Sequence, residues 1–385
     1  MHYFDWASTS PVSREALDEY NRISLLYPGN PSSVHPMGLD ARKHLDSCRS
    51  GIADMLRVNA SEIFFTSGGT EADNIVLQSL LAIPSPGEVL VTSMEHAAVL
   101  ENRNILAEHG WKVTLLPSSG GYIRPETLAR ALNPKVRMVC IMKVNNVTGS
   151  VQDTASLVKA IRSFEQQTGR RIHIHCDAVQ ALGKIPFYPS MENLDSAAFS
   201  AHKFSGPRGV GFLWCTRKQV RSLSSGGGQE SGVRPGTENL AGISAMTLAL
   251  GNSIRYLEKN GNHVAQLRSE VEKTAVELGF TLLSPSAQSA CAFSPYIICF
   301  SVRPVPSEVF LRVMADKGFC LSAGSACSTN SKGKAERVLE GMAVRPEDRR
   351  SAVRVSFGPG TTLDETLCLC NALRQTAKEL GNGKN

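Results

Sequence analysis

The sequence predicts an α/β protein in which a large domain with a mostly parallel sheet is followed by a small α+β domain. From residue 62 to about residue 215, short runs of β-forming residues alternate with helical patterns. From about residue 260, the strands become fewer and more widely separated, with amphipathic helices between them. The first pattern is typical of a parallel sheet flanked by helices, and the second is typical of an α+β domain.

The elements of the first region can be placed directly on the sequence. The expected strands are EIFFTS, EVLVTS, KVTLLP, VRMVCIMKV, RIHIHCDA, SAAFSA and GVGFLWCT. The expected helices are TEADNIVLQSLLA, AAVLENRNILAEH, PETLARAL and DTASLVKAIRSFEQQ. A glycine cluster at 224–232 then precedes one long helical run over 237–260, which we expect to cross from the large domain to the small one.

The small domain is expected to contain the strands FTLLS, YIICFSV and SAVRVSF and the helices SEVFLRVMADKG and DETLCLCNALRQTAKELG. We place the large domain at residues 13–250 and the small domain at residues 1–12 and 251–385. Because no internal repeat or flexible linker separates them, the two domains should pack closely.

The composition excludes several classes of protein. Of the 385 residues 42% are hydrophobic, but no apolar run approaches the roughly 18 residues of a membrane span and no signal-like segment opens the chain. The ten cysteines are scattered, as in a protein with reduced thiols, so we expect a cytoplasmic protein. The net charge of +6 comes from interspersed lysines and arginines, which favours an anionic cofactor or an acidic partner over direct nucleic-acid binding.

A glycine-containing turn, SGGTEADN at 67–74, joins an expected strand to an expected helix. Its two glycines allow a tight turn, Thr70 adds a hydroxyl, and the free N–H groups of the helix start point outward, which is how proteins hold a phosphate. An ordinary strand-to-helix turn with Thr70 as its N-cap would explain the same residues.

The segment HIHCDAVQ at 173–180 carries three polar residues on one face of a strand. His173, His175 and Asp177 could therefore bind a metal ion. Packed histidines explain such a pair more often, and no further ligands cluster nearby, so we expect no metal site. Asp177 ends the strand and can instead pair with a protonated ring nitrogen.

The segment FSAHKFSGPRGVG at 199–211 places Lys203 directly after a strand, between polar residues and a Gly-Pro turn. A lysine held in an active site can form a Schiff base with an aldehyde cofactor. Taken alone, Lys203 would more often be an ordinary exposed lysine. Taken together, a phosphate-binding turn, an aspartate and a lysine are the parts of a pyridoxal phosphate site.

These motifs resemble those of the cysteine desulfurases, class V members of the aminotransferase superfamily that share the fold of aspartate aminotransferase. The similarity runs almost from end to end, through YFDWASTSP, GNPSSVH, TSGGTEADN, EHAAVL, VNNVTGSVQD, HCDAVQ, FSAHKFSGPRGVG, GGGQESGVRPGTENLAGI, SAGSACS and VRVSFGPGTT. It implies a mostly parallel seven-stranded sheet in the large domain, pyridoxal 5'-phosphate as cofactor, L-cysteine as substrate and a homodimer.

Applied to this sequence, the resemblance makes Lys203 the Schiff-base lysine, Asp177 the partner of the pyridinium nitrogen, and His96 the residue that stacks on the ring and helps move protons. It makes Arg354 the group that grips the substrate carboxylate, a task suited to a forked guanidinium, with Asn30 in the same pocket. The remaining implied contacts are to the phosphate, from Gly69, Thr70, Ser200, His202 and, in the other subunit, Thr237, and to the ring or its 3-oxygen, from Asn146 and Gln180.

Single residues of this set have ordinary explanations when taken alone. His96 would be a packed or capping histidine, Asn146 a turn residue and Arg354 a surface arginine. The order of the motifs along the chain outweighs these alternatives. The chain departs from the family at Val147, where an acidic residue is more common, and at Ser231, where an arginine commonly follows GGGQE. These departures concern substrate or partner details rather than cofactor binding.

The resemblance also implies a nucleophile in SAGSACSTNSKGK at 322–334, where Cys327 would attack the substrate sulfur and leave an enzyme persulfide and alanine. This role requires a cysteine on a mobile loop, and the small residues around Cys327 predict one, before a helical pattern resumes at Ala335. By base rate alone, Cys327 would be an inert small residue.

The sequence therefore predicts a homodimeric cysteine desulfurase that passes persulfide sulfur to an acceptor protein, for iron–sulfur cluster assembly or tRNA thiolation. A selenocysteine lyase or another class V aminotransferase would use the same cofactor in a different reaction. A non-catalytic scaffold for cluster assembly is the alternative of another class, and the presence of Lys203, Asp177, His96 and Cys327 argues against it.

Overall fold

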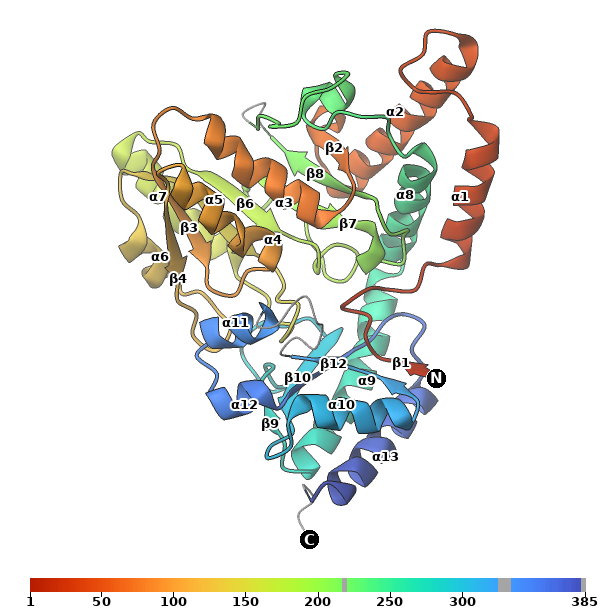
Figure 1. Cartoon of the computed structure of the whole chain (residues 1–385), viewed down its shortest axis with the longest axis vertical. Coiled ribbons are helices and arrows are strands. Elements are labelled where there is room, and N and C mark those ends of the chain that lie inside the picture. The colour runs from red at the N-terminus through yellow and green to blue at the C-terminus, as the bar shows by residue number, and fades with distance from the viewer. Residues whose placement is uncertain (217–219, 325–333, 382–385) are drawn as a thin grey trace.

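A seven-stranded sheet forms the centre of the large lobe of the molecule (Figure 1). The computed structural model describes residues 1–216, 220–324 and 334–381. The small lobe lies below the large one in Figure 1, and the N-terminus lies at it. The predicted α/β architecture of a large and a small part is confirmed.

The sheet of the large lobe is mostly parallel, as predicted. Its strands are β2 (Ile63–Thr66), β3 (Glu88–Thr92), β4 (Lys112–Leu116), β5 (Val136–Met142), β6 (His173–Asp177), β7 (Ser196–Ser200) and β8 (Gly211–Cys215), in the order β2-β8-β7-β6-β5-β3-β4. Only β8 runs antiparallel to its neighbours. Both faces are covered by helices, which explains the mostly apolar strand sequences.

The two faces of this sheet bury separate hydrophobic cores. One core contains Val76 and Leu213 and lies under α3 (Gly69–Gln78), α4 (Ala97–Leu100) and α5 (Asn102–Glu108). The other contains Ile161 and Phe199 and lies under α1 (Arg14–Leu26), α2 (Pro36–Leu56), α6 (Pro125–Ala131), α7 (Thr154–Thr168) and α8 (Leu240–Arg255). Short 3₁₀ turns are η1 (Ala60–Glu62), η2 (Ser79–Ala82), η3 (Ala201–Lys203) and η4 (Gln229–Gly232).

Two predicted helices are each divided in the structure. The helix expected over 97–109 consists of α4 and α5, which meet at Glu101. The long run expected over 237–260 breaks at Tyr256, whose φ of −105° and ψ of 16° are not helical, and α9 (Leu257–Glu277) then continues into the small lobe. The domain limit that we placed after residue 250 falls inside α8 and stays a prediction.

The small lobe contains a four-stranded antiparallel sheet in the order β12-β13-β10-β9. Its strands are β9 (Thr281–Leu282), β10 (Ile297–Ser301), β12 (Ser322–Ala323) and β13 (Ala352–Ser356). A further pair joins β1 (His2–Tyr3) to β11 (Phe319–Cys320). The helices are α9, α10 (Ser307–Asp316), α11 (Lys334–Gly341), α12 (Pro346–Arg350) and α13 (Leu363–Glu379).

Besides the run from α8 into α9, contacts at two further segments join the lobes. At the N-terminus, the ring of Phe4 packs edge-on against Phe357 in the small-lobe core, with ring centroids 6.0 Å apart. At α11, Leu339 belongs to the core of the large lobe, and the carbonyl oxygen of Gly341 accepts hydrogen bonds from the hydroxyls of Ser93 and Ser118, both at 2.7 Å. The lobes therefore share buried contacts, as expected for a chain without a flexible linker.

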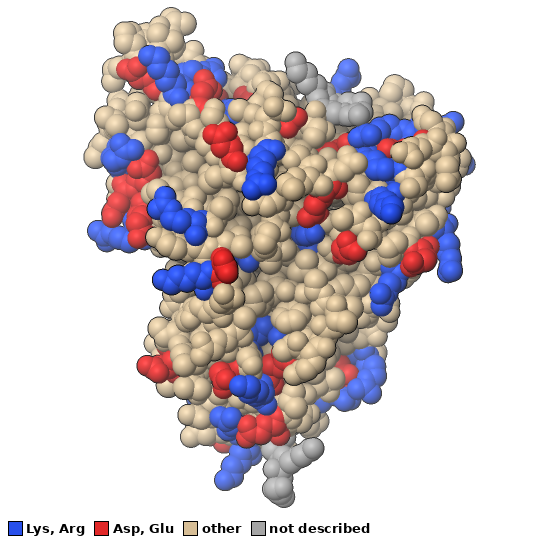
Figure 2. Space-filling model, turned by 180° about the vertical axis from the view of Figure 1, so that it is seen from behind, with Lys and Arg blue, Asp and Glu red and all other residues tan. Residues whose placement is uncertain are grey.

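The surface carries charges of both signs. On the face shown in Figure 2, lysines and arginines are interspersed with aspartates and glutamates rather than gathered in one large patch. Within the described parts of the chain, no helix combines the length and the apolar character needed to cross a membrane.

A buried ion pair holds the glycine-rich segment at 224–232 against the large lobe. Arg49 of α2 donates to both carboxylate oxygens of Glu230 at 2.7 Å, and the backbone N–H of Phe65 donates to the same carboxylate at 2.8 Å. Glu230 and Ser231 have φ values of 48° and 56°, a left-handed conformation that is uncommon outside glycine. The ion pair between Arg49 and Glu230 therefore stabilises a backbone conformation that is unfavourable for these two residues.

We expect the variant Glu230→Gln to lower the free energy of unfolding by about 3 kcal/mol, because the Arg49 guanidinium loses its counter-charge in a buried position. Urea denaturation followed by circular dichroism measures the change. The matched control is Glu277→Gln, which removes an exposed pair with Arg374 and should leave stability nearly unchanged. Equal losses in the two variants would contradict burial as the cause.

Candidate active site

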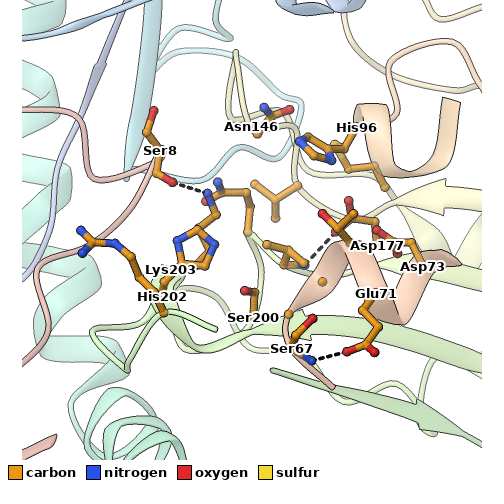
Figure 3. Close-up of a pocket in the computed structure, with 18 of the residues that line it drawn as sticks. Ser8, Ser67, Glu71, Asp73, His96, Asn146, Asp177, Ser200, His202 and Lys203 are labelled. Carbon is orange, nitrogen blue, oxygen red and sulfur yellow. Dashed lines mark hydrogen bonds between the residues drawn. The ribbon is translucent and has the colours of Figure 1, made fainter. Parts of the chain in front are cut away.

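A cavity of about 460 Å³ lies at the carboxyl ends of parallel strands in the large sheet. Ligands of open α/β sheets bind at this edge. Side chains from distant segments converge on it, and Figure 3 shows Lys203 and His202 across the cavity from Asp177 and His96. The predicted residues that line it are Gly69, Thr70, His96, Asn146, Asp177, Gln180, Ser200, His202 and Lys203.

The turn between β2 and α3 forms one end of the cavity. Gly68 has a φ of 155°, which side chains rarely allow, and a Cβ on Gly69 would lie 2.4 Å from Cγ2 of Val179. The N-cap residue of α3 is Gly68 and not Thr70, and it offers no capping side chain. The first N–H groups of α3 therefore remain available to an anion, and the Thr70 hydroxyl lies beside them.

Lys203 is held over the cavity by the N-terminal segment. Its Nζ donates to the carbonyl oxygens of Ala7 and Ser8, both at 2.7 Å. Burial, helped by the positive charge of Arg354, lowers the pKa of Lys203 to about 8, while the charge of Asp177 opposes the shift. Lys203 is thus half-buried and hydrogen-bonded to the backbone, which an ordinary exposed lysine would not be.

Asp177 and His96 form the opposite wall. Asp177 ends β6 in a buried position, and its Oδ1 accepts a hydrogen bond from the N–H of Val179 at 3.0 Å. Burial raises the pKa of Asp177, and the nearby His96 and Lys203 lower it. His96 caps α4 by accepting the N–H of Ala98 on Nδ1 at 3.1 Å, so its neutral ring carries the proton on Nε2.

Polar side chains complete the wall. The Oδ1 of Asn146 is buried without a hydrogen-bond partner among the described residues. Gln180 donates through Nε2 to the Ala7 carbonyl at 2.8 Å and accepts on Oε1 from Lys184 at 2.6 Å. Burial, with the nearby charge of Lys203, lowers the pKa of His202 to about 4, so this ring is neutral at physiological pH.

Arg354 lies directly behind the cavity wall. This β13 residue is 6% exposed, and its guanidinium donates to the Asn146 carbonyl at 2.8 Å, to Asp5 Oδ1 at 2.8 Å and to the Ser8 hydroxyl at 2.6 Å. Its Nε has no hydrogen-bond partner among the described residues. The buried guanidinium of Arg354 can therefore bind a carboxylate, and one side of the guanidinium already contacts the carboxylate of Asp5.

Two predicted residues that the structure describes are not brought to the cavity. Asn30 is exposed between α1 and α2, where its Oδ1 accepts the N–H of Ser32 at 2.9 Å. Thr237 is exposed and does not line the cavity of its own chain. Cys327 lies outside the described residues. The roles of these residues stay predictions.

The structure also adds residues that we did not single out from the sequence. Asp73 lines the cavity one turn after Gly69, and Asp5 and Ser8 contact Arg354. The helical spacing in SGGTEADN was the available signal for Asp73, because positions four apart share a helix face. No comparable signal links residues 5 and 8 to a residue near the other end of the chain.

The two histidines of β6, which we considered as possible metal ligands, both contact a serine hydroxyl. His173 Nε2 and His175 Nδ1 both lie 2.8 Å from the hydroxyl of Ser196. Throughout the described chain, no group of three potential ligands could hold a metal ion. These histidines therefore belong to a hydrogen-bonded network.

The residues present fit pyridoxal phosphate. The uncapped start of α3 suits its phosphate, and the buried carboxylate of Asp177 suits its ring nitrogen. Lys203 offers an amine of lowered pKa to its aldehyde. The unpartnered Oδ1 of Asn146 leaves a polar position on the cavity wall for the ring. The donor set of the cavity therefore matches the separate parts of this cofactor.

Comparison with known proteins agrees with this interpretation. The family model described as aminotransferase class-V matches residues 2–368. A NifS/IcsS protein homolog of Lactobacillus delbrueckii subsp. bulgaricus is 35% identical over 95% of this chain and 94% of its own. Cysteine desulfurase IscS of Dictyoglomus turgidum is 32% identical over 98% of this chain and 95% of its own. The solved structure of a NifS-like protein, 30% identical, superimposes with a TM-score of 0.90 and covers 99% of both chains.

We expect covalent capture of pyridoxal phosphate by the cofactor-free chain to speed up as pH rises through about 8, because only the neutral Lys203 amine attacks an aldehyde. Stopped-flow absorbance across a pH series measures the midpoint. In Arg354→Met the midpoint should move upward, because a nearby positive charge is lost. The exposed arginine variant Arg374→Met should keep the original midpoint, and a wild-type midpoint near the ordinary lysine value would contradict the assignment.

Proposed function

The chain belongs to the class V aminotransferase family, and we propose that it is a pyridoxal phosphate-dependent cysteine desulfurase that transfers sulfur from L-cysteine to Cys327. Relatives named cysteine desulfurase match it over nearly its whole length. One observation carries the proposal: Lys203, Asp177 and the uncapped start of α3 converge on a single cavity.

In the proposed reaction, different residues bind the cofactor, accept the substrate proton and bind the substrate carboxylate. When bound, pyridoxal phosphate supplies an electron sink for negative charge at the substrate carbon. The start of α3 would hold the phosphate, and Asp177 would place its negative charge against the ring nitrogen. Lys203, with a pKa of about 8, is partly neutral at physiological pH and can accept the substrate proton on Nζ. Arg354 binds the substrate carboxylate in place of, or beside, Asp5.

Cys327 is the proposed sulfur acceptor. Its thiolate forms an S–S bond with the substrate sulfur as the C–S bond breaks, and the substrate carbon keeps the bonding electrons and later gains a proton to give alanine. The last described residue before this cysteine is Gly324, whose N–H donates to the Ala352 carbonyl at 2.8 Å. Just before it, Ser322 pairs with Arg354 across β12 and β13. The segment therefore starts beside the proposed carboxylate site.

We propose a homodimer as the working unit. Exposed apolar side chains gather on α1, on the segment that follows it and on the first turns of α2: Leu17, Tyr20, Leu25, Leu26, Val34, Met37 and Leu39. A surface of this kind is typical of an interface. In such a dimer, Thr237 of one subunit would reach the phosphate of the other, which accounts for its exposure in the single chain.

The proposed setting is the cytoplasm. The nine cysteines within the described residues are all free thiols, as in proteins of reducing compartments. There the persulfide would pass to an acceptor protein, either an iron–sulfur scaffold or a tRNA-thiolation enzyme.

We expect Cys327→Ala to lower the release of sulfide and alanine from L-cysteine by about a hundredfold or more, because the nucleophile that accepts the sulfur is lost. Alanine and sulfide are measured with a thiol reductant present. The control Cys368→Ala removes an exposed thiol on α13 and should keep wild-type turnover. Unchanged turnover in Cys327→Ala, or build-up of pyridoxamine phosphate with a keto-acid requirement, would contradict the proposal.

The double variant Leu25→Glu/Val34→Glu should weaken self-association by at least about tenfold, or ~1.4 kcal/mol, because it places carboxylates in the proposed apolar interface. Sedimentation velocity across a concentration series measures the change. Met191→Glu alters an exposed methionine on a different segment and should leave association unchanged. A wild-type chain that sediments as a monomer would overturn the dimer.

A further inference from the structure

A row of hydrogen bonds leads away from the active-site cavity through the large lobe. Asp73 Oδ1 lies 3.0 Å from Nε2 of His175, whose Nδ1 lies 2.8 Å from the Ser196 hydroxyl. The same hydroxyl lies 2.8 Å from Nε2 of His173. Four groups that can each gain, lose or pass a proton are thus joined without a gap.

The two ends of this row open into different cavities. Asp73 lines the active-site cavity, and Figure 3 shows it beside Asp177. His173, at the start of β6, lines a second cavity of about 510 Å³, together with Arg137, Arg171 and other residues. The middle members, His175 and Ser196, are fully buried on neighbouring strands that pair at these two residues. The row therefore connects the carboxyl edge of the sheet with its amino edge.

The same four groups can hold their protons in two ways. In the first, Asp73 is neutral and donates to Nε2 of His175, Nδ1–H of His175 donates to Ser196, and Ser196 donates to a neutral His173. In the second, His173 is a cation and donates to Ser196, Ser196 donates to Nδ1 of His175, and Nε2–H of His175 donates to an ionised Asp73. The number of protons is equal in both. One proton has moved from Asp73 to His173, and the tautomer of His175 has reversed.

The charged groups around Asp73 favour the first arrangement at rest. Burial raises the pKa of Asp73, and the facing carboxylates of Asp177 and Glu95 add to the shift. Burial lowers the pKa of His175 to about 3, helped by His173, so His175 passes a proton on without keeping it. Asp73 therefore holds the proton that the row can move.

The outer end is placed to exchange a proton with solvent. His173 is only partly buried, whereas its partners in the row are enclosed. Asp195 lies close enough for the charge of His173 to lower its pKa. Arg137, Arg171 and Arg221 line the same cavity, so an extra positive charge on His173 is readily released there.

We propose that Asp73, His175, Ser196 and His173 form a proton relay that connects the active-site cavity to solvent on the opposite edge of the sheet. Through it, Asp73 can gain or lose a proton while a bound ligand closes the front of the cavity. Its use in catalysis rests on the proposed desulfurase function, in which protons leave and rejoin the substrate. The relay itself depends only on these four side chains.

Nuclear magnetic resonance of the full chain with ¹³C,¹⁵N-labelled histidine tests the relay directly. The nine histidines are assigned with His173→Gln and His175→Gln variants. As pH is raised and Asp73 loses its proton through the row, His175 should change from the Nδ1–H to the Nε2–H tautomer. His173 should change from Nδ1–H to Nε2–H with the same midpoint, because Ser196 then donates to His175 and accepts from His173. In Ser196→Ala, the tautomer of His173 should no longer follow that of His175, because the hydroxyl that joins the two rings is lost.

Further variants distinguish a proton relay from hydrogen bonds that only hold the four side chains in place. Ser196→Thr keeps a hydroxyl and should restore the linked change, whereas Asp73→Asn cannot accept the proton and should hold His175 in one tautomer. The control Ser301→Ala removes a buried strand hydroxyl outside the row and should leave the wild-type behaviour. If His175 keeps one tautomer throughout the wild-type titration, or if His173 still follows His175 in Ser196→Ala, the relay is wrong. This result does not depend on whether the protein desulfurates cysteine, which the alanine assay decides.

Discussion

The hydrogen bonds from Lys203 to the carbonyls of Ala7 and Ser8 tie the active site to the N-terminus. The Ala7 carbonyl also accepts from Gln180, so two side chains of the large lobe meet at one peptide group. From the small lobe, Arg354 reaches the same segment through Asp5 and Ser8. The proposed cofactor-binding lysine and the proposed carboxylate-binding arginine thus come from different lobes and are placed by one short segment. Any change in lobe packing must therefore alter both.

Three buried carboxyl groups constrain the electrostatics of this site. Burial and the charge of Asp177 raise the pKa of Asp73 and bring that of Glu95 to about 8, and Glu95 adds to the shift of Asp73. A low-dielectric region does not hold three negative charges together. Asp177 differs from the other two in having Lys203 nearby and in accepting the N–H of Val179, and both oppose the rise of its pKa. Of the three, it is the carboxyl group placed to carry a negative charge. The site thereby presents one negative charge where a protonated ring nitrogen would need it.

Much of the fold could be predicted because burial on both faces leaves a strong signal in the sequence. The strands appear as apolar runs, and their alternation with helices predicts a parallel sheet. The antiparallel direction of β8 could not be predicted, since a buried strand has the same composition in either direction. The break at Tyr256 also left no signal, because neither proline nor glycine stands there. Motif order brought nine site residues to one cavity, whereas the contacts of Asp5 and Ser8 with Arg354 depend on tertiary packing.

The proposed relay and Asp177, the proposed partner of the ring nitrogen, are linked through the same group of acids. Asp73 is the inner end of the relay and also a close neighbour of Asp177. When Asp73 holds its proton, it adds no charge beside Asp177, and Asp177 can stay ionised. When Asp73 sends that proton toward His173, its new negative charge opposes the ionisation of Asp177. The protonation of a histidine on the far edge of the sheet therefore reaches the ring-nitrogen partner through electrostatics alone, without movement of the backbone.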